Sequence, residues 1–295
     1  MNLSIGTREL ELGGKYLGSL RDATHLMSDL PALRERLVED GYLLIRQLHD
    51  PSKVKEARRV FLENLAAAGQ LDSGHPLADG VIAEGKRGRF DGDSKKITHS
   101  PEFLNLVESP ELMQFFSEFL GEPALTYDFK WLRVVGHRGF TGAHYDIVYM
   151  GRGTEEVYTV WTPLGDVRYE DGPLAMLVGS HQFDRIRQTY GKMDVDRDKV
   201  DGWFSNDPVE LVDSYGGQWQ TTEFKAGDAL IFGMYTMHGS IRNMTNRFRL
   251  SADTRYQRAS DPVDERWIGE NPKAHYAWLK GETVPMEEAR KRWGV

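Results

Sequence analysis

The chain has 295 residues, no cysteine and a formal net charge of −8. Without cysteine it forms neither disulfides nor thiolate metal sites, so histidine, aspartate and glutamate remain as the strong metal ligands. The acidic balance leaves no positive surplus for the phosphates of a nucleic acid. No basic leader and no apolar stretch long enough to span a bilayer is present. We therefore expect one cytoplasmic domain over residues 1–295, with neither nucleic acid nor membrane as a partner.

The first part of the chain, about residues 20–121, is predicted to be mainly helical. Apolar residues recur at helical spacing in 31–41, which Gly41 ends, in 51–68, and in 100–120, where one or two helices are expected. A short apolar strand is expected at 42–45.

Residues 70–97 contain repeated glycines and no sustained period. This pattern predicts an irregular loop, and such loops often rim a functional site.

From about residue 124 to 258 the pattern changes to short β-branched and aromatic runs separated by glycine, proline and aspartate. This pattern predicts a mainly β fold with flanking helices, built on a double-stranded β-helix, the jelly-roll core also found in cupins. The candidate strands are 130–135, 144–149, 157–162, 174–178, 228–232 and 248–254.

Two further regions flank or interrupt this core. Residues 183–221 break the strand rhythm and are predicted to form an insertion that covers a pocket. The C-terminal extension, residues 262–295, is expected to be helical over 272–293. It packs either on the outside of the core or at a subunit contact, which leaves a homo-oligomer open.

A candidate metal site lies in the strand-rich region. On a strand, alternate side chains leave the same face, so His144 and Asp146 would point together and Tyr145 away. His238, from a distant strand, would complete a two-histidine, one-carboxylate triangle that leaves positions open for a bidentate co-substrate and O2. One or two such His-x-Asp pairs arise by chance in a chain with nine histidines and 45 acidic residues, so the downstream context must support the assignment.

That context is an arginine 11 residues after the distal histidine. Arg249 lies two residues before Ser251, so both would share one strand face. A guanidinium can bind a carboxylate through two parallel hydrogen bonds. Arg249 is therefore a candidate for binding a carboxylate.

With these motifs the sequence resembles the phytanoyl-CoA dioxygenase family of Fe(II)/2-oxoglutarate oxygenases, from about residue 30 to about 260. The matching segments are Glu39-Asp-Gly-Tyr-Leu-Leu-Ile45, His144-x-Asp146, Tyr158-Thr-Val-Trp-Thr-Pro-Leu-Gly-Asp166, Glu170-Asp-Gly-Pro-Leu174, Gly179-Ser-His181, Gly227-Asp228 and His238 through Arg249.

The resemblance implies that His144, Asp146 and His238 bind iron and that Arg249 holds the distal carboxylate of 2-oxoglutarate. The cofactors it implies are Fe(II), the co-substrate 2-oxoglutarate and O2. Three further residues are candidates for the co-substrate pocket: Trp161, which resembles a family tryptophan, Ser251, which shares the face of Arg249, and Lys130, on the strand before the His-x-Asp pair.

The activity implied is hydroxylation of an unactivated C–H bond of a small organic molecule, with release of succinate and CO2. Desaturation, cyclisation and epimerisation stay open, because they use the same chemistry, whereas the retained Asp146 argues against halogenation. Two rivals are a catalytically silent jelly-roll binding protein and a cupin enzyme that uses no 2-oxoglutarate. The intact triad and Arg249 count against both, and nothing in the sequence identifies a coenzyme A thioester as the substrate.

Overall fold

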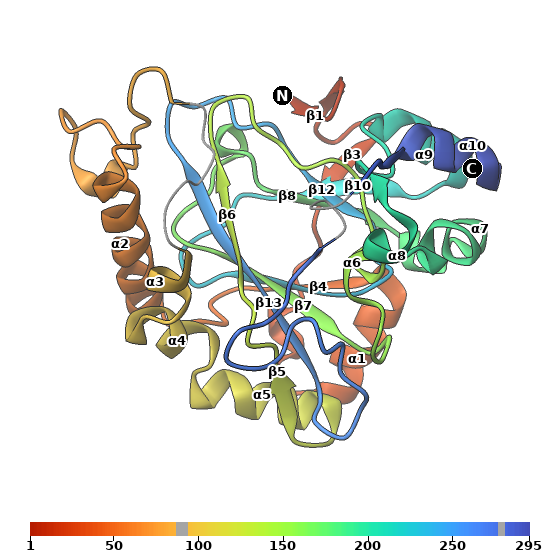
Figure 1. The fold of residues 1–295 in the computed structure, drawn as a ribbon, viewed down its shortest axis with the longest axis horizontal. Coiled ribbons are helices and arrows are strands. Elements are labelled where there is room, and N and C mark those ends of the chain that lie inside the picture. Colours follow the sequence, from red (N-terminus) through yellow and green to blue (C-terminus); the bar gives the residue numbers. More distant parts are fainter. Residues whose placement is uncertain (87–93, 277–280) are drawn as a thin grey trace.

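The computed structural model describes residues 1–86, 94–276 and 281–295. Two sheets face each other and form the predicted jelly roll (Figure 1). The larger sheet contains β4 (Tyr42–Ile45), β11 (Ala229–Gly233), β7 (Tyr158–Pro163) and β13 (Arg249–Arg258), with β5 (Ala124–Thr126) and β6 (Trp131–Val135) both paired to β13. The smaller sheet runs β12 (His238–Ser240), β8 (Leu174–Val178), β10 (Gln218–Thr221) and β3 (Leu17–Ser19). The mainly β fold class with flanking helices is confirmed.

Helices cover the outer face of the larger sheet (Figure 1). They are α1 (Leu30–Asp40), α2 (Pro51–Ala67), α3 (Ser94–Thr98), α4 (Pro101–Val107) and α5 (Pro110–Leu120). Local sequence sets their ends: the side chain of Asp29 accepts a hydrogen bond from the Ala32 N–H at the start of α1, and Gly41, at φ +80°, ends that helix. The predicted helices and the strand at 42–45 are confirmed, and 100–120 forms two helices.

The alternation of β13 assigns its side chains to two environments. Leu250, Ala252 and Tyr256 face outward, where Leu250 and Ala252 pack with α2 and α4, and Tyr256 stacks on Phe116 of α5 with ring centroids 4.1 Å apart. The intervening side chains face the space between the two sheets. This inner set comprises Arg249, Ser251, Asp253, Arg255 and Gln257.

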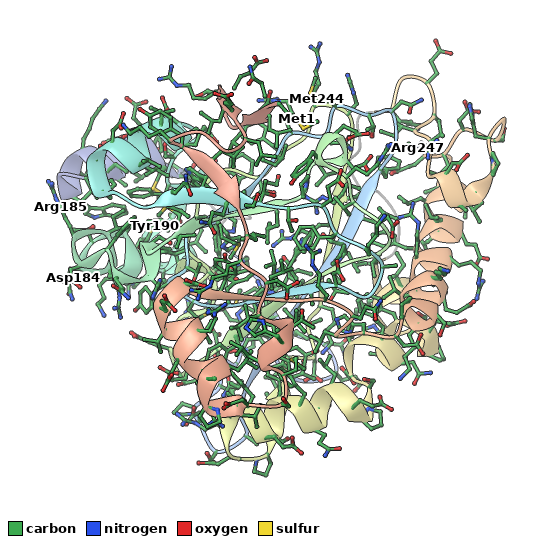
Figure 2. The ribbon with its side chains drawn as sticks, turned by 180° about the vertical axis from the view of Figure 1, so that it is seen from behind. Met1, Asp184, Arg185, Tyr190, Met244 and Arg247 are labelled. Carbon is green, nitrogen blue, oxygen red and sulfur yellow. The ribbon has the colours of Figure 1, made fainter. Side chains whose placement is uncertain are left out.

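The insertion and the C-terminal segment gather at one end of the sheets (Figure 1). They contribute α7 (Asp184–Gln188), α8 (Val195–Asp198), β9 (Val200–Asp201), α9 (Pro208–Tyr215), β14 (Val284–Pro285) and α10 (Met286–Trp293). β9 pairs with β14, and Arg290 of α10 forms an ion pair with Glu210 of α9. Seen from behind, Asp184 and Arg185 of α7 lie on the side opposite Arg247 (Figure 2).

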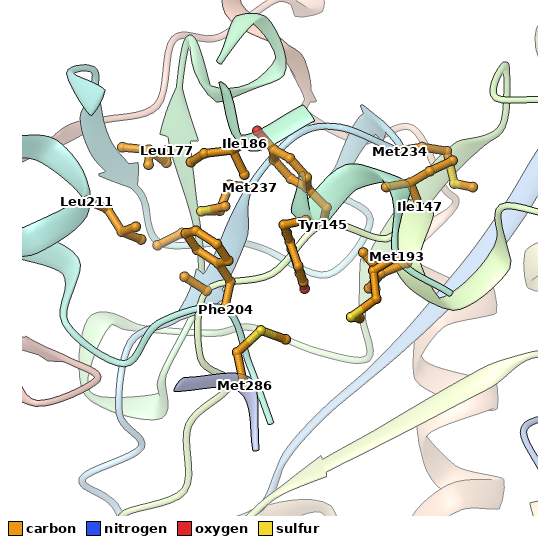
Figure 3. Packing of buried hydrophobic residues seen from close by; sticks show 14 of the residues in the cluster. Tyr145, Ile147, Leu177, Ile186, Met193, Phe204, Leu211, Met234, Met237 and Met286 are labelled. Atoms are coloured by element: carbon orange, nitrogen blue, oxygen red, sulfur yellow. The ribbon is translucent and has the colours of Figure 1, made fainter. Parts of the chain in front are cut away.

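Several predictions about local structure differ from what is observed. The strand at 144–149 is wrong: His144 makes a single bridge to His238, and Ile147–Met150 form the short helix α6, whose Ile147, Val148 and Met150 enter an apolar cluster. Tyr145 does point away from the metal site, into the same cluster as Ile186 and Met237 (Figure 3).

The predicted insertion at 183–221 extends too far, because its last four residues form β10, a strand of the smaller sheet. In the C-terminal extension the helix starts only at Met286, and residues 277–280 of the predicted helix lie outside the described residues. The loop at 70–97 contains a 3-10 turn at Leu77–Asp79 and ends in α3, while its residues 87–93 are likewise not described.

The N-terminal hairpin of β1 (Asn2–Ile5) and β2 (Arg8–Glu11), and the short strands β3 and β5, were not predicted. The distant strand expected to carry His238 is present as β12. Within the described ranges, no helix is both long and apolar enough to cross a membrane.

Candidate metal centre

Two histidines and one aspartate meet between the sheets. One ligand atom from each of His144, Asp146 and His238 lies within 4.8 Å of the others, and all three side chains are buried. A backbone bridge brings the distant segments together, because each histidine N–H donates to the carbonyl of the other, at 3.0 and 3.1 Å. Asp146 Oδ1 lies 3.8 Å from Nε2 of both rings. The three atoms thus converge on one point, as a facial triad requires.

Backbone carbonyls fix both imidazoles. His144 Nδ1 lies 2.9 Å from the carbonyl oxygen of Gly142, and His238 Nδ1 lies 3.0 Å from that of Thr236. An Nδ1–H donating to a carbonyl leaves the Nε2 lone pair for a metal. Burial lowers the pKa of His144 to about 3 and also lowers the pKa of His238, so both rings are neutral at pH 7.

The two carboxylate oxygens of Asp146 have different surroundings. Its Oδ2 accepts hydrogen bonds from Thr159 Oγ1 at 2.6 Å and from Arg255 Nη2 at 3.1 Å, which leaves Oδ1 facing the histidines. Burial alone would raise the pKa of this carboxyl, but Arg255, the two histidines and Thr159 together hold the pKa well below its usual range. Asp146 is therefore ionised, and its orientation is fixed before a metal binds.

Arg249 is held on the inner face of the larger sheet, as the alternation predicts. Its Nη1 donates to Ser251 Oγ at 2.7 Å, its Nε donates to the Gly172 carbonyl at 3.1 Å, and its guanidinium lies 5.8 Å from the Trp161 ring centre. Among the described residues no carboxylate forms an ion pair with Arg249, and burial lowers its pKa to about 10. The buried Trp161 Nε1 also finds no hydrogen-bond partner within that part of the chain.

These groups fit a dicarboxylate co-substrate. A buried arginine without a carboxylate, next to a hydroxyl and an unpartnered indole N–H, offers donors that a carboxylate would satisfy. The donor set of two neutral imidazoles and one carboxylate suits Fe(II). Both fits rest on residues that the sequence analysis had singled out.

A cavity of about 540 Å³ opens beside the triad. Its walls combine the larger sheet, α6, the insertion and the C-terminal segment. The lining residues beyond His144 and Asp146 are Trp131, Arg133, Thr141, Tyr149, Met150, Met193, Val195, Val200, Asp201, Gly202, Trp203, Arg255 and His275. Arg249 is not among them; it borders a second cavity of about 450 Å³ with Arg58 and Arg247.

Sequence reasoning missed three residues of this centre. Arg255 and Thr159 hold Asp146, and Arg133 forms an ion pair with Asp253 at 2.7 Å on the cavity wall. Arg255 lies an even number of residues after Arg249 and Ser251, so strand alternation could have placed it on the same face. Nothing in the sequence indicates that its partner is Asp146.

Lys130 lies apart from the triad. Its ammonium group forms an ion pair with Glu108 at 2.8 Å and donates to the Tyr127 carbonyl, and it lines neither of the two cavities. Because successive side chains alternate, Trp131 faces the cavity while Lys130 turns to α4 and α5.

A jelly roll that joins two histidines and an aspartate beside a buried arginine defines the class of Fe(II)- and 2-oxoglutarate-dependent oxygenases. Within this class, the family model described as phytanoyl-CoA dioxygenase (PhyH) matches residues 37–251. The chain therefore belongs to the phytanoyl-CoA dioxygenase family, as the sequence motifs predicted, and is an enzyme of this dioxygenase class.

Relatives of known activity are more distant. The 1-deoxypentalenic acid 11-beta-hydroxylase of Streptomyces exfoliatus is 26% identical over 261 residues, which cover 81% of this chain and 85% of that protein. Among solved structures, the alpha ketoglutarate-dependent epimerase SnoN from nogalamycin biosynthesis has a TM-score of 0.56 at 19% identity and covers 88% of this chain and 98% of its own. EctD from S. alaskensis with 2-oxoglutarate and 5-hydroxyectoine has a TM-score of 0.55 at 20% identity, covering 96% and 99%. These two structures support the fold.

Proposed function

We propose that this enzyme hydroxylates an unactivated C–H bond of a small, largely apolar organic molecule, with 2-oxoglutarate as co-substrate. The observation that carries the proposal is the convergence of Asp146 Oδ1 and two Nε2 atoms, at 3.8 Å, beside a cavity with mostly apolar walls. The hydroxylase relative supports this reaction type.

The proposed division of roles follows from the geometry. His144 and His238 would bind iron through Nε2 and Asp146 through Oδ1, while Thr159 and Arg255 hold Asp146 in place. Arg249, with Ser251 and Trp161, would bind the distal carboxylate of 2-oxoglutarate. When bound, iron would allow O2 to act as the oxidant of the C–H bond, while 2-oxoglutarate would supply two electrons and leave as succinate and CO2.

The remaining lining residues would place the substrate and exclude water. Aromatic and aliphatic side chains such as Trp131, Tyr149, Val200 and Trp203 surround the space next to the triad. An apolar wall keeps water from the reacting carbon and strengthens the electrostatic contacts inside the site. Because the family name does not carry its substrate to this chain, no coenzyme A thioester is proposed.

The test is an anaerobic titration of metal-free protein with Fe(II) and then 2-oxoglutarate, followed by the weak visible charge-transfer band of the chelate. We expect a band that is lost in His144→Ala and that needs about tenfold or more 2-oxoglutarate in Arg249→Ala. Arg59→Ala is the matched control, because Arg59 lies exposed on α2 and, within the described part of the chain, forms ion pairs with three glutamates that are at least partly exposed.

Bound iron without any band on addition of 2-oxoglutarate would overturn the proposal. With the band in hand, a screen of small molecules for succinate release under 18O2 separates hydroxylation from the other outcomes. A product that carries 18O supports hydroxylation, whereas turnover to an isomer or a desaturated product without 18O contradicts it.

A further inference from the structure

Arg133 presents a guanidinium group to the cavity beside the metal centre. It lies on β6 directly opposite Ser251 of β13, so both side chains leave the inner face of the larger sheet. The side chain of Arg133 is 40% exposed, and it lines the cavity. The guanidinium is therefore open to a ligand that enters this space, next to the residues that hold the metal site.

The protein uses only one edge of this guanidinium. Nε of Arg133 donates to Asp253 Oδ2 at 2.7 Å, and neither Nη1 nor Nη2 donates a hydrogen bond to any residue that the structure describes. A guanidinium carries five N–H donors, so the four on the two Nη atoms are left for a ligand. The contact with the buried Asp253 fixes the direction in which these donors point.

Tyr149 adds a second hydrogen-bond donor to the same cavity. Its ring centre lies 5.7 Å from that of the metal-site residue His144, and its side chain lines the cavity. Across residues 1–86, 94–276 and 281–295, the Tyr149 hydroxyl has no hydrogen-bond partner. A phenol is protonated at pH 7 and can donate. Two polar groups with free donors thus interrupt walls that are otherwise mostly apolar.

The balance of buried charge favours an anionic ligand. On the inner faces of β6 and β13 and in the triad, the described residues carry three guanidiniums and two carboxylates, which belong to Arg133, Arg249, Arg255, Asp146 and Asp253. This set leaves one positive charge. Fe(II) and the 2-oxoglutarate dianion carry equal and opposite charges, so binding of both leaves the surplus unchanged. Asp201 also lines the cavity, but it is exposed to water, which screens its charge.

We infer that Arg133 is a substrate-contacting residue that binds the carboxylate of an otherwise apolar acid through Nη1 and Nη2, with the Tyr149 hydroxyl as a second donor. The inference rests on the proposed function, because it takes the cavity beside the triad as the substrate pocket. A planar guanidinium matches a carboxylate through two parallel hydrogen bonds. The single surplus charge and the apolar walls assign the substrate class as apolar monocarboxylic acids, and Asp253 is the positioning residue for Arg133.

The test uses adamantane-1-carboxylate and adamantane-1-carboxamide, two rigid probes of nearly equal shape, of which only the first is charged. Each is added without O2 to the protein loaded with Fe(II) and 2-oxoglutarate, and the concentration that half-shifts the visible band is measured. We expect the carboxylate to act at about tenfold lower concentration than the amide. The band should shift and not disappear, because 2-oxoglutarate stays bound.

Variants identify the group responsible. Arg133→Gln should abolish the preference, whereas Arg133→Lys, which keeps the charge but not the paired donors, should keep part of it. Asp253→Asn is the matched control for the lost ion pair: the guanidinium stays, the amide oxygen can still accept from Nε, and the preference should persist. Tyr149→Phe should raise the half-shifting concentration of the carboxylate about threefold. Thermal unfolding checks that each variant is folded.

Equal responses to the two probes, or no response to either, would overturn the inference while the band itself upholds the proposed function. A preference that persists in a folded Arg133→Gln variant, or that is lost equally in Asp253→Asn, would also overturn it. Loss of the band with the carboxylate, reversed by more 2-oxoglutarate, would place the probe at Arg249 instead. A tenfold rise in half-saturating 2-oxoglutarate in Arg133→Gln would assign Arg133 to the co-substrate. Absence of the band in the wild type would be a failure of the proposed function and not of this step alone.

Discussion

The two faces of β13 differ in composition although their residues alternate along one strand. Outward, Leu250, Ala252 and Tyr256 pack against α2, α4 and α5. Inward, each charged side chain is matched to a polar partner, as Arg255 is to Asp146. The comparison teaches that the outer face of a single strand can pack against the helices while its inner face holds buried charges that have polar partners. Residues that stabilise the fold and residues that serve the metal site therefore alternate along this strand.

This separation has a physical basis. Buried charges cost free energy unless they are paired and hydrogen-bonded, so the inner face contributes little net stability. Apolar burial under the helices contributes the stabilising term. We therefore expect inner-face substitutions to change ligand affinity and outer-face substitutions to change the free energy of unfolding. The predictions below test where this rule holds.

The largest effect is expected for Asp146→Ala. The change removes a metal ligand and leaves the guanidinium of Arg255 buried without its carboxylate. Fe(II) affinity should fall by more than about 100-fold, and the free energy of unfolding of the metal-free protein by about 3 to 5 kcal/mol. Anaerobic Fe(II) titration and urea unfolding measure the two quantities.

His238→Ala is the matched control for Asp146→Ala, because it removes a ligand of the same centre without orphaning a charge. It should lose iron to a similar extent and clearly less stability. If Asp146→Ala still binds Fe(II) with the affinity of the wild type, the triad is assigned wrongly.

Leu250→Ala should show the opposite profile. Leu250 is 1% exposed and packs in the cluster beneath α2 and α4. Truncation leaves a cavity and should lower the free energy of unfolding by about 3 to 4 kcal/mol. The concentrations of Fe(II) and 2-oxoglutarate that half-form the visible band should stay within about twofold of the wild type, which assumes additivity between the two faces.

Its neighbour Ser251 provides the comparison within the strand. Ser251→Ala removes the hydroxyl bonded to Arg249 and should raise the half-saturating 2-oxoglutarate concentration about fivefold, at a smaller cost in stability. Similar effects of both variants on 2-oxoglutarate would contradict the division between the two faces.

A polar pair on the outer side makes stability depend on pH. His49 is buried, and its Nε2 lies 3.0 Å from Thr162 Oγ1. Burial, with a smaller effect of Lys53, lowers the pKa of His49 from 6.5 to about 4. Since the folded pKa is the lower one, the unfolded chain takes up the proton first as the pH falls. The contribution is complete above pH 6.5 and is lost toward pH 4, by about 3 kcal/mol in total.

Urea unfolding of metal-free protein at pH 7 and pH 4 measures this loss, and His49→Gln isolates it. Glutamine keeps a hydrogen bond to Thr162 but does not titrate, so the variant should lose about 3 kcal/mol less than the wild type between the two pH values. The buried histidines of the metal centre are common to both proteins and cancel in the difference. Equal losses would show that His49 does not carry the effect.

How far the sequence predicts the site depends on whether the signal is local. Alternation along β13 placed Arg249 and Ser251 on one face, and it extends to Arg255, but a period cannot name the partner that a side chain meets across the barrel. His144 and Asp146 do come together as predicted, but the predicted strand is absent, because the helix α6 begins directly after Asp146. Two ligands two residues apart can converge from a bridge and a turn as well as from a strand.

The fold was predictable where apolar periods were long, and the misses share a cause. β10 is a short polar strand with only Trp219 and Thr221 buried, and its tertiary pairing with β8 and β3 decides its conformation. The cavity wall combines α6, the insertion and His275, three segments far apart in the chain. No local sequence pattern shows that these segments lie together, so the cavity wall was the least predictable part of the site.

The smallest effect is expected for Lys130→Met, which examines a residue predicted for the co-substrate pocket. Lys130 is buried, but its ammonium group pairs with Glu108, whose side chain is 36% exposed, and it lines neither cavity. Methionine fills similar space and removes the charge, so the half-saturating 2-oxoglutarate concentration should stay within about twofold while stability changes by about 1 kcal/mol or less. If Lys130 bound the carboxylate of 2-oxoglutarate, loss of its charge would lower the affinity for 2-oxoglutarate about tenfold or more. A shift of that size would return Lys130 to the co-substrate site and show that its position directly before β6 does not keep its side chain away from that site.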